Sequence, residues 1–167
     1  MKWDLRFLRL AAEVATWSKD PSTHCGAVIA RPDHTIVSLG YNGFPRRTPD
    51  REEDYADRDK KLSRVIHAEV NAILNAHGSV EGCTLYSYPP GHGPTCDRCA
   101  AHVIQVGIAR VVGIAAPSSF ATRWKESCEA AVAHYADAGV EVTMIPWEQF
   151  AYGIPYEEGS RPASETA

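Results

Sequence analysis

Hydrophobic residues near the beginning of the chain recur at alternating intervals of four and three residues, which is the spacing of one face of an α-helix. The residues of this face are Trp3, Phe7, Leu10, Val14 and Trp17. A proline at position 21 follows, and because the residue before a proline disfavours the helical conformation, we expect the helix to have ended by that point. The pattern therefore predicts an amphipathic helix that buries these five side chains.

Short apolar runs bounded by turn residues predict the strands. Two runs, 26–30 and 35–41, are joined by Pro32-Asp33, a pair typical of the turn in a hairpin. Three further runs lie at 83–88, 110–115 and 140–145. We therefore expect five strands, the first two antiparallel to each other.

Helical patterns alternate with the later strands. They cover 63–77, 96–106 and 122–138, and a glycine follows each of them. Residues 42–62 are polar and show no period, which predicts a long loop, and loops of that length are usually functional. Alternating strands and helices favour a sheet that is parallel in its second half, with helices on both faces. The fold class is therefore α/β, a three-layer α/β/α domain.

Length and composition exclude several classes of protein. A chain of 167 residues with 44% hydrophobic and 23% charged residues is typical of one folded domain, which we place at 1–150. We expect the remaining 151–167 to form a partly disordered tail. The net charge of −4 provides no positive surface for nucleic acid, and no apolar run approaches the ~20 residues of a membrane span. Because the first residues do not resemble a secretory signal, a cytoplasmic location is predicted.

Two short motifs contain the candidate chemistry. His67-Ala68-Glu69 opens one predicted helix region, and Cys96-Asp97-Arg98-Cys99 opens the next. Each motif alone is weak evidence, but five cysteines in a chain without a secretory signal favour metal chemistry over disulfides. One imidazole and two thiolates form a donor set suited to zinc, and helix N-termini favour the thiolate form.

Three protein ligands leave one zinc position open for water, which is typical of catalytic zinc sites. Glu69 is not needed as a ligand and is therefore free to move protons. A histidine, a glutamate two residues later and a Cys-x-x-Cys pair together form the signature of zinc nucleobase deaminases. We therefore predict one catalytic Zn²⁺ per chain, held by His67, Cys96 and Cys99, with Glu69 as the catalytic residue.

The chain resembles the deoxycytidylate (dCMP) deaminase family within the cytidine deaminase superfamily. The similar segments are 18–23, 26–29, Gly40-Tyr41-Asn42-Gly43-Phe44-Pro45-Arg46, 67–74 and 104–108. The resemblance extends from about residue 11 to 145. It implies a mixed five-stranded sheet, hydrolysis of dCMP to dUMP and ammonia, and a homo-oligomer, either a dimer or a hexamer. It also implies that Asn42 contacts the nucleotide sugar and that the backbone of Ala68 contacts the pyrimidine.

Basic residues after Asn42 are candidates for binding the nucleotide phosphate, and Arg46 belongs to the similar segment. The other interpretation is a solvated loop with ion pairs. The candidates are Arg46, Arg47, Lys60, Lys61 and Arg64.

The sequence departs from the family pattern just before the first cysteine. Thr95 stands where most members have proline, and the segment 89–95 is longer than usual. Because this segment joins a strand to the helix of the cysteines, we expect it to line the pocket and influence which nucleotide is accepted.

Three functions remain open. The first is a deaminase of dCMP, or of a modified or differently phosphorylated nucleotide, which has a small-molecule partner, no nucleic acid and no membrane. The second is a nucleic-acid-editing deaminase, for which the charge of −4 is unfavourable. The third is a redox or structural zinc protein, in which His92 is the candidate for a fourth ligand.

Overall fold

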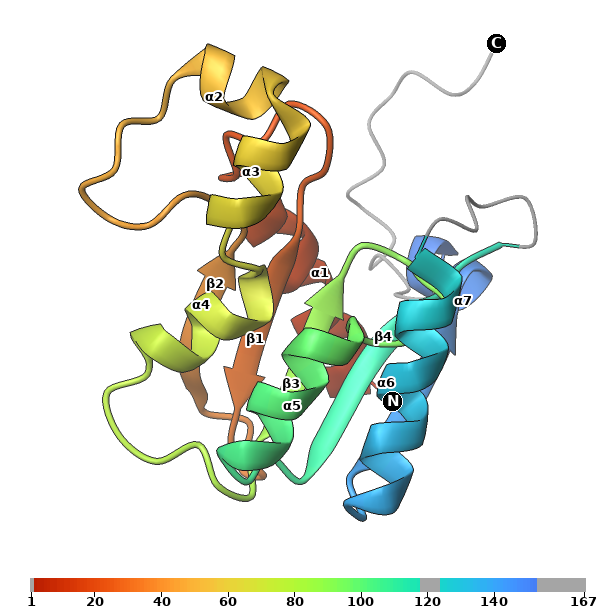
Figure 1. Ribbon diagram of the computed structural model, residues 1–167. Coiled ribbons are helices and arrows are strands. Elements are labelled where there is room, and N and C mark those ends of the chain that lie inside the picture. Colours follow the sequence, from red (N-terminus) through yellow and green to blue (C-terminus); the bar gives the residue numbers. More distant parts are fainter. Residues whose placement is uncertain (1, 118–123, 153–167) are drawn as a thin grey trace, which may run out of the picture.

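Five strands form one mixed sheet in the order β2-β1-β3-β4-β5 (Figure 1). The computed structural model describes residues 2–117 and 124–152. β1 pairs antiparallel with both β2 and β3, whereas β3, β4 and β5 run parallel. The strands are β1 (Gly26–Ala30), β2 (Ile36–Tyr41), β3 (Thr84–Tyr88), β4 (Arg110–Ala115) and β5 (Glu141–Pro146). The predicted hairpin and the parallel second half of the sheet are confirmed.

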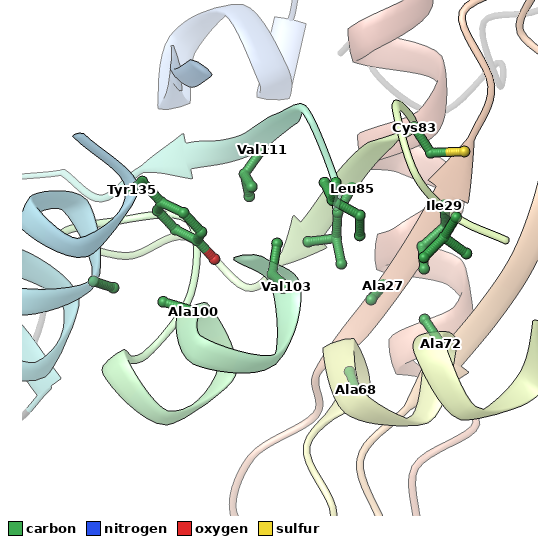
Figure 2. Packing of buried hydrophobic residues seen from close by; sticks show 13 residues of the cluster. Ala27, Ile29, Ala68, Ala72, Cys83, Leu85, Ala100, Val103, Val111 and Tyr135 are labelled. Atoms are coloured by element: carbon green, nitrogen blue, oxygen red, sulfur yellow. The ribbon is translucent and has the colours of Figure 1, made fainter. Parts of the chain in front are cut away.

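Helices cover both faces of this sheet. Alternate residues of β1 point in opposite directions, so Ala27 and Ile29 pack against α4 and α5, whereas Val28 and Ala30 pack against α1. Figure 2 shows the first of these two cores, where small and branched side chains from α4 and α5 meet the sheet. The principal helices are α1 (Lys2–Ala15), α4 (Ala68–Asn75), α5 (Asp97–Gln105), α6 (Lys125–Asp137) and α7 (Trp147–Tyr152). The α/β class with three layers is therefore confirmed.

The first helix buries a different stripe from the predicted one. Phe7 and Val14 lie in the core, but Trp3 and Trp17 are 41% and 50% exposed. Leu8, which the predicted stripe omits, is completely buried. The core side of α1 must fit closely over the sheet, and the smaller leucine and alanine side chains fit there. Trp3 lies in the first turn of α1 and Trp17 lies beyond its last residue, Ala15, so both rings remain at the edge.

The predicted loop 42–62 is wrong in its second half, because two short helices lie there. They are α2 (Glu52–Ala56) and α3 (Arg58–Arg64). The side chain of Asp54 is buried and forms ion pairs with Lys60 and Arg64, which ties α2 to α3. Tyr55 stacks on Phe44 with ring centroids 4.2 Å apart. The predicted helix 63–77 accordingly divides into the end of α3 and a separate α4.

Other predicted boundaries differ by a few residues. The predicted helix 122–138 begins at Lys125 among the described residues, and positions 122–123 lie outside them. Residues 151 and 152 of the predicted tail belong to α7, and 153–167 lie outside the described part. None of the helices within the described ranges has the length and apolar character needed to cross a membrane.

One glycine lets α4 approach the sheet closely. A Cβ atom at Gly40 of β2 would lie 2.3 Å from both the Ala68 oxygen and the Ala72 nitrogen, which is much closer than real Cβ contacts. Only glycine permits this distance between backbones. The beginning of α4, where the histidine of the predicted metal site lies, is thereby held against β1 and β2.

Candidate metal centre and cavity

The structure brings together the three residues predicted to bind metal. The Nδ1 atom of His67 lies 3.4 Å from the sulfur of Cys96 and 3.4 Å from the sulfur of Cys99. All three ligand atoms lie within 4.8 Å of one another. Among the described residues, this is the group of histidine, cysteine and acidic side chains whose geometry could hold a metal ion.

Helix N-termini position these ligands. His67 caps α4 with extended backbone, and Cys96 caps α5 in the same way. Cys99 is the third residue of α5, so its thiol lies on the turn that follows Cys96. Because the exposed amides at a helix N-terminus carry partial positive charge, thiolates are favoured there. The alternation of strand and helix brings both N-termini to the same edge of the sheet.

The spacing and chemistry of the donors fit zinc. A tetrahedral ion with Zn–S of about 2.3 Å and Zn–N of about 2.05 Å separates sulfur and nitrogen by about 3.5 Å. The observed nitrogen–sulfur distances are both 3.4 Å. A hydrogen bond from Cys99, together with His67, lowers the pKa of Cys96 to about 4, while the same Cys96–Cys99 contact raises the pKa of Cys99. One thiolate is therefore favoured without metal, and a divalent cation would stabilise the second.

Glu69 lies beside the ligands without being one of them. Its Oε2 atom is 3.5 Å from the sulfur of Cys99, and the carboxylate lines the adjoining cavity. Burial raises the pKa of Glu69, and the neighbouring His67 opposes this only in part. A raised pKa makes the carboxylate a stronger base, which suits a group that takes up and returns protons in acid–base catalysis.

A cavity of about 200 Å³ opens directly over His67, Glu69 and Cys96. One wall carries most of the polar side chains and is formed mainly by the segment after α1 and by α3, where Leu62 also lines the cavity. The other is largely apolar and is formed by the segment after β3 and by α6. The polar side chains are Asp20, Ser22, Thr23, Asn42 and Lys61, and the second wall includes Tyr88, Pro90, Gly93, Trp124 and Cys128. The cavity therefore combines a buried acid, a candidate metal site and two contrasting walls.

Asn42 lines this cavity and also holds its rim together. Its Oδ1 accepts a 2.7 Å hydrogen bond from the Cys25 amide, and its Nδ2 donates to the Thr23 carbonyl at 2.9 Å. A longer contact of 3.4 Å links Nδ2 to Asp20. The donors of Asn42 are thus engaged within the protein, while Oδ1 can accept one more hydrogen bond.

Of the basic residues proposed to bind phosphate, the structure brings Lys61 into the cavity. Its ammonium lies 2.7 Å from Asp20 and also contacts Ser22. Arg46 does not line the cavity, because its guanidinium turns away and donates to Asn75 at the end of α4. The sequence placed Asp20 just before the proline that follows the first helix and within the similar segment 18–23, with no role in the site. An Asp-Pro-Ser-Thr run, however, also predicts an Asx turn, and Asp20 accepts hydrogen bonds from the backbone of Ser22 and Thr23.

The segment 89–95 forms much of the second wall. Gly91 pairs with the end of β4 through hydrogen bonds to Ile114 and Ala116, so the segment is attached to the sheet. His92, the candidate for a fourth zinc ligand, is not part of the group formed by His67 and the two cysteines. Its buried Nε2 has no hydrogen-bond partner among the described residues.

Several proteins with similar sequences are named deaminases. The profile of the cytidine and deoxycytidylate deaminase zinc-binding region matches residues 1–115. An uncharacterized deaminase in the luxG 3′ region of Aliivibrio fischeri is 42% identical over 145 residues, covering 87% of this chain and 95% of the relative. Deoxycytidylate deaminase of Homo sapiens is 36% identical over 120 residues, covering 67% of this chain and 64% of the human protein. The probable deoxycytidylate deaminase of Drosophila melanogaster is 38% identical over 125 residues, and the chain spans 59% of its length. The chain therefore spans less than two thirds of these two animal relatives.

Solved structures share the fold at lower sequence identity. The apo form of dCMP deaminase from the cyanophage S-TIM5 superimposes with a TM-score of 0.64 at 18% identity, covering 86% of this chain and 98% of the phage protein. The same phage enzyme in complex with dCMP and dUMP gives a TM-score of 0.63 at 20% identity, covering 84% and 94%. At these identities the likeness establishes the fold.

Proposed function

This chain belongs to the cytidine and deoxycytidylate deaminase zinc-binding family, and from that membership we propose that it converts dCMP and water into dUMP and ammonia. Relatives from several animals are named deoxycytidylate deaminases, and the phage enzyme of the same fold binds dCMP and dUMP. The proposal also includes one zinc ion per chain at His67, Cys96 and Cys99.

The observation that carries the proposal is the position of Glu69. It lines the cavity beside the candidate ligands but outside the ligand set, and burial raises the pKa of its carboxyl group. A structural zinc site has four protein ligands and no use for such an acid. A redox dithiol would not need Glu69 either. Hydrolytic removal of an amino group requires several proton transfers, for which this carboxyl group is well placed.

The mechanism divides the chemistry between the metal site and Glu69. Zinc held by these ligands would supply a Lewis acid that makes water a better nucleophile. As that water attacks C4 of the pyrimidine, Glu69 takes one of its protons and passes it to N3. Glu69 then takes the proton of the new C4 hydroxyl group and delivers it to the amino group, which leaves as ammonia. Atoms balance, and the carboxyl group returns to its initial state.

The two walls suggest how a nucleotide would be oriented. We assign the base to the end near Glu69, where the backbone of Ala68 begins α4. The sugar would lie near Asn42, whose Oδ1 can still accept a hydroxyl proton. Lys61 is the cation that lines the polar wall, so we assign it, in place of Arg46, to the phosphate. Replacing Lys61 with Gln should raise KM for dCMP more than KM for deoxycytidine, which has no phosphate.

We also propose that the segment 89–95 determines which pyrimidine is accepted. It lines the cavity and is attached to β4 through Gly91, which gives the wall a definite position. A changed pocket wall discriminates between closely related substrates by about 1–3 kcal/mol. Shortening the segment should therefore change the ratio of kcat/KM between dCMP and 5-methyl-dCMP while zinc content stays constant. If the ratio of kcat/KM between the two nucleotides does not change, the residues that determine specificity lie in the region 42–64 instead.

Assembly and location complete the proposal. Ile36, Tyr41 and Leu74 are exposed on β2 and α4, which pack together at one edge of the sheet, and exposed apolar side chains there favour a homo-oligomer. The molar mass measured by light scattering should be that of a dimer or a hexamer, and Leu74→Glu should weaken this assembly. A cytoplasmic location fits because the metal-binding thiols must stay reduced.

A nucleic-acid-editing deaminase is the second candidate, because base-flipping enzymes of similar chemistry exist. The net charge of −4 provides no general attraction for a polyanion.

An ammonia-release assay tests both candidates. The substrates are dCMP, CMP, deoxycytidine, dCTP, 5-methyl-dCMP and a cytosine-containing single-stranded oligonucleotide, each with wild-type and Glu69→Gln protein. The proposal requires the highest kcat/KM for dCMP and a loss of at least about 10²–10⁴-fold in the Glu69→Gln variant. Release from the oligonucleotide alone would support editing, and no release from any zinc-loaded sample would refute deamination.

A further inference from the structure

The helix α6 contacts both neighbours of the first cysteine in the candidate metal site. Thr95 precedes Cys96, and its hydroxyl group lies 2.8 Å from the hydroxyl group of Tyr135, in the last turns of α6. Both side chains are buried, and Tyr135 has no exposed surface. Figure 2 shows the Tyr135 ring within the core beside α5, with Ala100 and Val103 close by.

On the other side of Cys96, Asp97 is bound to the first turn of the same helix. The hydroxyl group of Ser127 donates to the Asp97 carboxylate at 2.7 Å and accepts from the Asp97 amide at 3.3 Å. Cys96 itself caps α5, so its backbone is held on both sides by α6.

A third contact holds the segment that leads to Cys96 against α6. Gly93 packs so closely on α6 that a Cβ atom there would lie 2.7 Å from the Cys128 carbonyl oxygen. Cys128 and Tyr135 lie seven residues apart, two turns along one face of the helix, and Ser127 is the neighbour of Cys128. This part of α6 therefore contacts Gly93, Thr95 and Asp97.

We infer that α6 is a positioning element for the metal ligand Cys96 and that Tyr135 is its principal positioning residue. The matched family region ends at residue 115, so this helix lies outside the region that contains the ligands themselves. The Thr95 hydroxyl also lies 3.1 Å from the Cys96 carbonyl, so the pair with Tyr135 connects directly to the ligand's backbone.

Hydrogen bonds that orient a metal ligand, without binding the metal themselves, set the expected change in zinc affinity. Groups that orient metal ligands typically change metal affinity 10- to 100-fold when they are removed. The pair is buried, so Thr95→Val leaves the Tyr135 hydroxyl group without its partner, and Tyr135→Phe leaves the Thr95 hydroxyl group bound to the Cys96 carbonyl alone. Either variant should therefore hold Cys96 less firmly, and the double variant should lose little more than each single one.

Zinc affinity of the full chain, measured by chelator competition, tests this inference, which rests on the metal site of the proposed function. The variants are Tyr135→Phe, Thr95→Val, the double variant and Thr95→Ser, which keeps the hydroxyl group. Tyr86→Phe is the matched control, since Tyr86 also makes a buried hydroxyl hydrogen bond, to Asp4, in the core on the other face of the sheet. Absorption of the Co²⁺-substituted protein reports thiolate coordination independently of turnover.

We expect 10- to 100-fold weaker zinc binding and an altered thiolate–Co²⁺ band in Tyr135→Phe and Thr95→Val. Thr95→Ser and Tyr86→Phe should retain the wild-type affinity and spectrum. If Tyr135→Phe does not fold, the inference is tested by comparing the zinc affinity of Thr95→Val, which lacks the hydroxyl group, with that of Thr95→Ser, which keeps it. Wild-type affinity in Thr95→Val, or an equal loss in Tyr86→Phe, would overturn the inference while the metal site stands. A wild-type chain that binds no zinc would refute the proposed metal site and this inference together.

Discussion

Replacing Glu69 with Gln tests the central chemical role in the proposed function. The amide has nearly the shape of the carboxyl group but cannot accept and release protons near neutral pH. Its contact with Cys99, at 3.5 Å, is long, so little support for the metal ligands is lost. Because the amide and the carboxyl group have nearly the same volume, the variant should keep the wild-type fold.

The effect on turnover should be large. One acid–base group is commonly worth about 10²–10⁴-fold in rate, which corresponds to about 2.7–5.4 kcal/mol. Glu69 is proposed to serve both the attack of water and the departure of ammonia. The loss of kcat for dCMP should therefore lie at the upper end of that range or beyond it.

The assay compares ammonia release with zinc content in the same samples. Glu129→Gln is the matched control, because Glu129 is an exposed glutamate on α6 whose nearest ion-pair partner is Lys125 at 3.8 Å. The control should keep wild-type turnover, and both variants should contain one zinc per chain. Near-normal turnover by zinc-loaded Glu69→Gln would refute the assignment of Glu69 as the proton carrier.

Three further predictions concern other parts of the molecule. His92→Ala should retain one zinc per chain by elemental analysis, because His92 lies outside the ligand group, and loss of zinc would indicate a closed structural site. Gly40→Ala should lower the free energy of unfolding by at least about 1–3 kcal/mol in denaturant titration, since its Cβ would lie 2.3 Å from the α4 backbone, and an unchanged value would contradict this packing. Burial raises the pKa of Asp4, but hydrogen bonds from Arg110 outweigh it and lower the pKa below its ordinary 3.8. The ionised Asp4 therefore stabilises the fold above that pH, and this stabilisation is lost on acidification. As the pH drops below about 4, the Tm of Asp4→Asn should fall less than the Tm of the wild type. Parallel curves of Tm against pH would show that the Asp4–Arg110 pair does not stabilise the fold.

Strand positions could be predicted closely because buried strands are short apolar runs with clear ends. The runs 26–30 and 110–115 coincide with β1 and β4. Both strands are almost wholly buried, so nearly every position must be apolar, and the turn residues beside them stop the pattern. Local composition is sufficient for this kind of element.

The short helices of the cavity rim could not be predicted in the same way. α2 and α3 have five and seven residues, too few to be stable as isolated helices. They depend on contacts with each other and with the rim, above all the buried Asp54 with its two cations and the stack of Tyr55 on Phe44. The spacing of hydrophobic residues in the sequence does not predict such contacts. The position of Lys61 on α3 was therefore not predictable either.

The amino-acid sequence by itself was enough to predict the donor set of the candidate metal site and the acid beside it, because the chemistry of zinc and of proton transfer requires particular residue types at short spacings. Only the tertiary structure decided which distant residues share the cavity. Arg46 and Lys61 both carry a positive charge, but the path of the chain turns one toward Asn75 and the other toward Asp20. Tyr135 likewise reaches Thr95 across forty residues of sequence. Such contacts arise from the packing of α3, α4 and α6 against the sheet, where burial and shape outweigh local preference.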